Sequence, residues 1–203
     1  MGGLAYVDFR SAFDSIDRQP LWLLLRSKGI PDKLLELDLY SNTLSCVRVD
    51  GELSPWFKVS AGVRQRCVLA PDFFLEPMDW VLDRTVHRGY LGLNVGNETF
   101  TDLDFADDVS LLASMLEIVV LALEILHEES SQLGLEINWT KTKIQAFDED
   151  ISQPSKVSVL GHDVEVVDSF VYLGSCIDIA GGSETDIMQE DRDDSYLHEG
   201  SRT

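Results

Sequence analysis

Three aspartates lie beside apolar segments, where a carboxylate needs a charged or polar partner. Asp8 lies in the apolar run Leu4–Phe9, and Asp107 and Asp108 lie between Phe105 and Val109. Burying such carboxylates is costly unless a cation or hydrogen-bond donors satisfy them. Mg²⁺ suits this setting because it takes a few carboxylates together with waters and phosphate oxygens. We predict a site for Mg²⁺ or Mn²⁺, and an ordinary solvated turn is the alternative for the adjacent aspartate pair.

Five segments, in this order within residues 4–178, resemble motifs A to E of the reverse transcriptases, and the last two resemble those of the non-LTR (LINE-type) retrotransposons. They are Val7–Asp14 for motif A, Gly62–Gln65 with Leu69–Pro71 for motif B, Phe105–Asp108 for motif C, Leu133–Asn138 with Lys141–Lys143 for motif D, and Phe170–Ser175 for motif E. The order of all five makes the resemblance specific to this family.

The resemblance implies an RNA-directed DNA polymerase that acts on an RNA template, a DNA primer and deoxynucleotide triphosphates. In such enzymes two metal ions about 4 Å apart stabilise the attacking and leaving oxygens of nucleotidyl transfer. By resemblance, Asp8 and Asp107 bridge the ions and Asp108 is the third carboxylate. The catalytic and metal-binding residues are therefore expected to be the same three aspartates, with Lys141, or failing it Lys143, donating a proton to the leaving pyrophosphate.

Further roles follow from the same resemblance. Phe13 matches the bulky residue that excludes a ribonucleotide 2′-hydroxyl, and Gln65 matches the residue that contacts nucleotide and template. Tyr172, Leu173 and Gly174 match the primer grip. The alternatives stay open: Phe13 as a core aromatic, the lysines as solvated side chains, and the primer-grip segment as a plain β-turn.

Two features depart from the family pattern. Arg66 stands where motif B has glycine, a residue that usually allows close approach of the backbone to a neighbour. The net charge of −20 has the wrong sign for gripping a polyanion. We expect a truncated, retrotransposon-derived palm whose fingers and thumb are missing and whose binding of nucleic acid is weak. The alternative function is a non-catalytic relic that binds divalent cations or a protein partner.

The secondary structure that must position these residues mixes strands, hairpins and amphipathic helices. Strands are expected at residues 4–9, 144–147, 157–160, 164–167 and 170–173. A strand pair that turns at Asp107-Asp108 is expected at 104–113, and hairpins are expected at 46–59 and 91–103. Helices are expected at 15–29, 31–41, 73–87 and 115–133, with Asp17 as a cap and Gly134 as a stop. This pattern favours an α+β palm with an antiparallel sheet and helices on one face.

The pattern predicts one palm domain over residues 1–178 and an acidic, disordered tail over 179–203. No segment approaches the ~20 consecutive apolar residues of a membrane span, and no signal peptide opens the chain. We therefore expect an intracellular protein, with nucleus and cytoplasm not distinguished.

Overall fold

A six-stranded sheet forms the centre of the fold in our computed structural model, which describes residues 2–35, 40, 43–65, 67–147 and 154–179. The strand order is β11-β12-β10-β1-β9-β8. The strands are β1 Gly2–Val7, β8 Asp102–Phe105, β9 Asp108–Ala113, β10 Lys143–Phe147, β11 Lys156–Val159 and β12 His162–Val166. Neighbouring strands run antiparallel except β10 and β12, which are parallel. The predicted α+β sheet is confirmed, with this one pair making it mixed.

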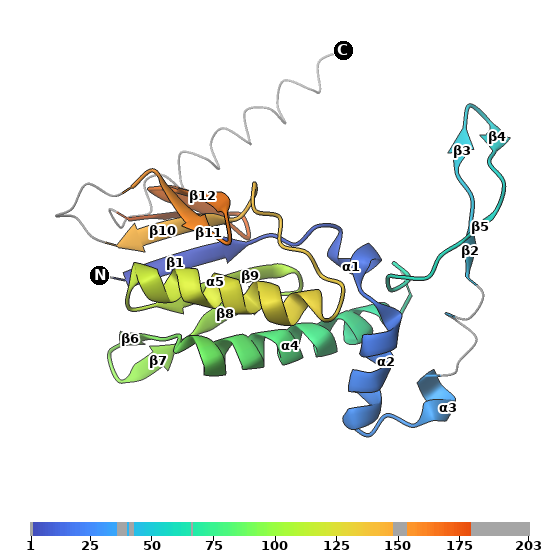
Figure 1. The fold of residues 1–203 in the computed structure, drawn as a ribbon, viewed down its shortest axis with the longest axis horizontal. Helices are drawn as coiled ribbons and strands as arrows, with labels where there is room; N and C mark the ends of the chain where they lie inside the picture. The colour runs from blue at the N-terminus through green and yellow to red at the C-terminus, as the bar shows by residue number, and fades with distance from the viewer. Residues whose placement is uncertain (1, 36–39, 41–42, 66, 148–153, 180–203) are drawn as a thin grey trace, which may run out of the picture.

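Two long helices, α4 (Ala70–Gly89) and α5 (Leu116–Ser131), cover one face of the sheet (Figure 1). On α5 the fully buried residues Val119, Ala122, Leu123 and Leu126 recur at helical spacing, which presents an apolar stripe to β1 and β9. Helix α4 packs beside α5. The predicted arrangement, with helices on one face, is therefore confirmed.

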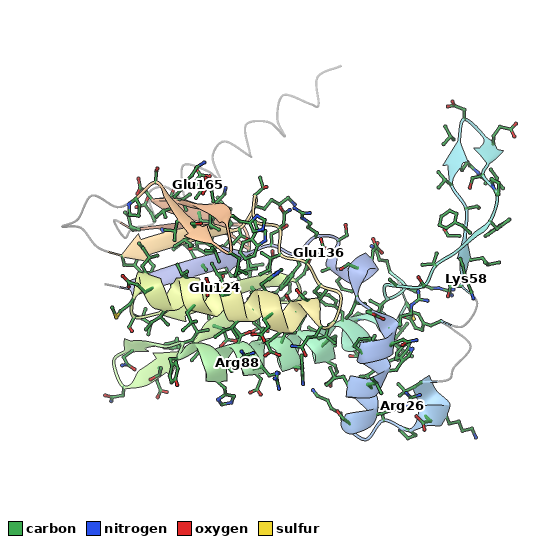
Figure 2. The ribbon with its side chains drawn as sticks, viewed as in Figure 1. Arg26, Lys58, Arg88, Glu124, Glu136 and Glu165 are labelled. Atoms are coloured by element: carbon green, nitrogen blue, oxygen red, sulfur yellow. The ribbon has the colours of Figure 1, made fainter. Side chains whose placement is uncertain are left out.

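A buried carboxylate fastens the two helices together. Glu129 on α5 has no exposed surface and accepts hydrogen bonds from Arg84 (2.5 Å) and Arg88 on α4. Burial alone would raise the pKa of Glu129, but the bonds from the two guanidinium groups outweigh it and lower the pKa. Figure 2 shows Arg88 on α4 alongside α5.

Three short helices follow β1: α1 (Ala12–Ser15), α2 (Arg18–Ser27) and α3 (Asp32–Leu35). The predicted cap of α2 is confirmed, because the Asp17 side chain accepts a hydrogen bond from the Gln19 amide at 2.9 Å. The helix predicted for residues 31–41 is described from Asp32 to Leu35, and residues 36–39 and 41–42 lie outside the described part.

A narrow two-stranded arm projects from the body beyond α2 (Figure 1). It consists of β2 Leu44–Ser45 paired with β5 Phe57–Lys58, and β3 Arg48–Val49 paired with β4 Glu52–Leu53. Figure 2 shows Lys58 at the base of the arm. The predicted Asp50-Gly51 turn is confirmed, with φ of 50° and 88° at the two residues, as a tight hairpin turn requires.

Two further hairpins complete the structure: β6 Leu93–Val95 with β7 Glu98–Phe100, and β13 Ser169–Tyr172 with β14 Ser175–Asp178. The first was predicted, whereas β14 was not. Hairpin β13–β14 packs against the sheet face opposite the helices, because Tyr6 stacks on Phe170 (4.1 Å between ring centroids) while its neighbours Ala5 and Val7 belong to the helix-side core. Residues 180–203, most of the predicted tail, lie outside the described part.

Candidate active site

Two of the predicted carboxylates meet at the ends of adjacent strands. The antiparallel pairing of β1 with β9 places Val7 opposite Val109. Continuing this register by one residue places Asp8, just after β1, opposite Asp108, the first residue of β9. Because side chains alternate along a strand, Asp8 shares the face of Tyr6, opposite the helices.

A pocket of about 270 Å³ contains both carboxylates. Its lining residues are Tyr6, Val7, Asp8, Asp108, Val109, Lys141, Phe170 and Tyr172. The pocket therefore joins segments of motifs A, C, D and E that are far apart in the sequence. Its lining combines two carboxylates, one ammonium group and three aromatic rings.

Asp107 lies beside this pocket but does not line it. The turn of the β8–β9 hairpin is Ala106-Asp107, with a φ of 60° at Ala106, and Asp108 already belongs to β9. The prediction that the strands turn at Asp107-Asp108 is therefore wrong by one residue. Asp107 is exposed, yet it acts on its neighbour: burial, then Asp107, then Asp8 raise the pKa of Asp108.

The fit of a metal ion to this site can be judged from the carboxylate oxygens. Asp8 Oδ2 is buried and has no hydrogen-bond partner. Within the described ranges, no three His, Cys, Asp or Glu side chains converge closely enough to form a complete metal-binding group. Mg²⁺ usually takes only one or two protein carboxylates and keeps several waters. Asp8 and Asp108 fit that requirement, with Asp107 adjacent.

Lys141 is held next to Asp8 by the turn that carries it. Its Nζ lies 3.4 Å from Asp8 Oδ1. The turn is bonded to the Asp8 backbone on both sides: Asn138 N–H donates to the Asp8 carbonyl at 2.7 Å, and Asp8 N–H donates to Thr142 Oγ1 at 3.4 Å. The alternative lysine, Lys143, instead bonds Glu165 at 2.7 Å and does not line the pocket.

The predicted primer-grip residues divide into an anchor and a turn. Tyr172 Oη donates to the carbonyls of Leu103 and Asp108, both at 3.2 Å, and so ties hairpin β13–β14 to hairpin β8–β9. Leu173 and Gly174 form an exposed turn with φ of 50° and 88°. The local structure of Leu173 and Gly174 is therefore a β-turn, and Tyr172, which precedes it, lines the carboxylate pocket.

Sequence reasoning missed a buried glutamine that holds the same hairpin. Gln145 on β10 has no exposed surface, accepts a bond from Tyr6 Oη at 2.8 Å, and donates to the carbonyls of Asp168 (2.8 Å) and Ile177 (3.2 Å). A polar residue at a core position of a strand was the available signal, because such a group needs partners.

The predicted nucleotide-binding residues, Phe13 and Gln65, do not line the carboxylate pocket. Phe13 is half-buried and stacks on the buried Phe74, with 4.2 Å between ring centroids. Gln65 is exposed, and its Nε2 donates to both carboxylate oxygens of Asp14 at 3.2 Å. Gln65 and Asp14 line a second pocket of about 530 Å³ beside the arm.

Glycine is required where motif B meets motif A. Gly62 has a φ of +77°, and a Cβ there would lie 2.7 Å from the Asp14 carbonyl oxygen. The Gly62 amide donates to Ile16 O (2.8 Å) and the Val63 amide to Phe13 O (2.7 Å). Arg66, the departure from the family pattern, lies outside the described residues.

A second missed residue, Arg18, organises this loop. It is 9% exposed and donates to four backbone carbonyls at 2.8–3.2 Å: those of Tyr40, Val59, Ala61 and Gly62. Its guanidinium carbon also lies 5.0 Å from the centre of the Tyr40 ring. Burial lowers the pKa of Arg18. An arginine next to a helix cap gave no sequence signal of burial.

Comparisons with known proteins agree with the geometry. A family model described as reverse transcriptase (RNA-dependent DNA polymerase) matches residues 3–174. The Pol polyprotein of the type-1 retrotransposable element R2 from Nasonia vitripennis is 31% identical over 136 residues, which is 66% of this chain and 13% of that protein. The corresponding polyprotein of element R2DM from Drosophila melanogaster is 30% identical over 140 residues, 68% of this chain and 13% of that protein.

Solved structures resemble the fold at low sequence identity. Apo telomerase from Candida tropicalis, truncated from its C-terminal domain, superimposes with a TM-score of 0.55 at 15% identity, over 81% of this chain and 34% of that one. This likeness concerns the fold alone. None of the helices in the described part of the chain is long and apolar enough to span a membrane.

Proposed function

The chain belongs to the reverse transcriptase (RNA-dependent DNA polymerase) family, and we propose that it is the palm of a retrotransposon polymerase in which Asp8, Asp107 and Asp108 form the nucleotidyl-transfer site. The chain spans 13% of the length of the R2 polyproteins it matches. The RNA template, DNA primer and deoxynucleotide triphosphates are therefore part of the proposal.

The observation that carries the proposal is the meeting of Asp8 and Asp108 at one end of the β1–β9 pair. They line one pocket, and the buried Oδ2 of Asp8 lacks a partner. Two carboxylates that line one pocket, one of them with an unsatisfied oxygen, suit a divalent cation. When bound, two such ions would stabilise the attacking and leaving oxygens of nucleotidyl transfer.

The protein groups around the carboxylates have complementary roles in this proposal. Lys141, on the same pocket, is the candidate proton donor to the leaving pyrophosphate. Tyr172 lines the same pocket and bonds the Asp108 carbonyl, and together with the turn Leu173-Gly174 that follows it would hold the primer end. Positioning of this kind supplies much of the rate in phosphoryl transfer.

Phe13 and Gln65 would act on the incoming nucleotide. The stack on Phe74 holds the Phe13 ring in place, as a residue that excludes a 2′-hydroxyl requires, and it fits the core-aromatic alternative equally well. Gln65 is exposed on a loop fixed to motif A by the Gly62 and Val63 amides, so it is available to a nucleotide or template base.

The test is a titration of the 203-residue chain with Mn²⁺, in which binding is measured by the paramagnetic broadening of assigned NMR signals. Asp8→Asn and Asp107→Asn are each expected to weaken binding roughly tenfold, because ligand charge sets affinity for hard cations. Asp163→Asn is the matched control, since among the described residues the ion-pair partner of this exposed carboxylate is Lys156, at 3.8 Å. Equal broadening in all four proteins would refute the proposed site.

The relic function is the second candidate, and the net charge of −20 favours it because that charge repels a polyanion. Primer extension by the purified chain on an RNA template separates the two. Repulsion between exposed charges fades beyond about 10 Å at 0.1 M salt, so the assay is repeated across salt concentrations. Primer extension that disappears in Asp107→Asn would exclude the relic function. No extension at any salt concentration would favour it.

A further inference from the structure

Lys141 faces a carboxylate that is expected to bind metal. Of the described residues that line the 270 Å³ pocket, Lys141 is the one cation, and Asp8 and Asp108 are the two anions. The Lys141 Nζ donates to Asp8 Oδ1 at 3.4 Å, and Asp8 Oδ2 has no hydrogen-bond partner. The ammonium group thus neutralises part of the charge that a divalent cation would use.

This contact is built into the backbone. Asn138 and Thr142 bond the carbonyl and the amide of Asp8, so the turn that carries Lys141 is fixed at both ends to its partner. The Lys141 amide closes the same turn by donating to Asn138 O at 3.0 Å. The Lys141 side chain itself is 68% exposed, which leaves it free to swing away from Asp8 without disturbing the turn.

We propose that Lys141 is the counter-ion of Asp8 in the metal-free site, that a divalent cation displaces it, and that Lys141 thereby lowers the affinity of the site for metal. This inference rests on the proposed function, because it assumes that Asp8 binds metal. Displacement places a freed ammonium group beside the site when metal enters. A proton donor for the leaving group then becomes available in step with metal binding.

The magnitude follows from the exposure of the pair. An exposed ion pair contributes a factor of about 1.4 to 5, and the repulsion between the ammonium and the entering cation adds to it. Lys141→Gln is therefore expected to tighten Mn²⁺ binding about three- to tenfold. No loss of fold is expected, since the replaced side chain is mostly exposed.

The experiment titrates the 203-residue chain with Mn²⁺ alone and measures free Mn²⁺ by electron paramagnetic resonance. Lys143→Gln is the matched control: it removes the same charge two residues away, from a lysine that bonds Glu165 and Thr140 O and not Asp8. Lys143→Gln is expected to leave the Mn²⁺ affinity within about twofold, because salt screens a charge that does not contact the site. Any general effect of net charge would appear equally in both variants.

A second measurement needs no variant. With lysine side chains labelled with ¹³C, addition of diamagnetic Mg²⁺ is expected to shift the Lys141 ε-carbon signal and to leave that of Lys143 in place. Metal-dependent change at both lysines, or at neither, would contradict displacement.

The outcomes separate this inference from the proposed function. If Asp8→Asn loses the site while Lys141→Gln binds like the wild type or more weakly, the metal site stands and the counter-ion role is refuted. If the wild type binds no Mn²⁺, a site that appears in Lys141→Gln supports the counter-ion role. The absence of a site in both proteins overturns the counter-ion role together with the metal site.

Discussion

Replacing Arg18 by methionine tests the role of a buried cation whose partners are backbone carbonyls. Within the described part of the chain no carboxylate pairs with this guanidinium; its bonds go to the carbonyls of Tyr40, Val59, Ala61 and Gly62. Methionine keeps a similar length and apolar stem but offers no donor. The substitution therefore removes the bonds and little of the packing.

The expected destabilisation comes from the number of bonds and their burial. Four hydrogen bonds at about 1 kcal/mol each give roughly 4 kcal/mol, and carbonyls left unsatisfied cost more while those that regain water cost less. We expect the free energy of unfolding to fall by about 3–5 kcal/mol. Arg18→Lys should recover part of this, because an ammonium group donates three bonds but lacks the planar fork.

The assay is urea denaturation followed by circular dichroism. Arg26→Met is the control on the same helix: Arg26 pairs with Asp32 on the surface, with 44% and 64% of the two side chains exposed, and should contribute at most about 1 kcal/mol. In Arg18→Lys, hydrogen exchange at the Gly62 and Val63 amides should accelerate relative to the wild type. If Arg18→Met were no less stable than Arg26→Met, with unchanged exchange, Arg18 would not organise the motif B loop.

Two further predictions concern the carboxylate pocket. Tyr172→Phe removes the hydroxyl that bonds Leu103 O and Asp108 O, and it should lower the free energy of unfolding, measured by urea denaturation, by about 1 kcal/mol. Tyr90→Phe, at an 81% exposed residue, should cause no measurable change. Equal losses in the two variants would show that the Tyr172 hydroxyl does not anchor the hairpin. Because the pKa of Asp108 is raised, its carboxyl favours the folded state at low pH, and this contribution is lost as pH rises through the folded pKa. Asp108→Asn should therefore stabilise the chain at about pH 7 and have little effect at about pH 3, and a gain that is the same at both would contradict the cause assigned to the shift.

The sequence by itself determined the local elements and the family. Apolar spacing predicted α4 and α5, the Asp50-Gly51 pair predicted the arm's turn, and Asp17 predicted the cap of α2, because each is set by neighbours within a few residues. The motifs in their order identified a reverse transcriptase. Strand β14 was missed because a short strand at the end of a pattern carries little periodicity of its own.

Only the tertiary structure decided which of these residues meet. The β1–β9 register opposes Asp8 and Asp108, and the turn at Ala106-Asp107 leaves Asp107 out of the lining of their pocket. Phe13 and Gln65 do not line that pocket either, and Gln65 lines another. The roles of Arg18, Gln145 and Tyr172 depend on backbone carbonyls supplied by other segments. Side-chain type shows that a buried polar group needs partners. Which partners it finds is fixed by strand register and by packing between segments that can lie more than a hundred residues apart, as Tyr6 and Gln145 do. A single sequence has no local signal for such pairings.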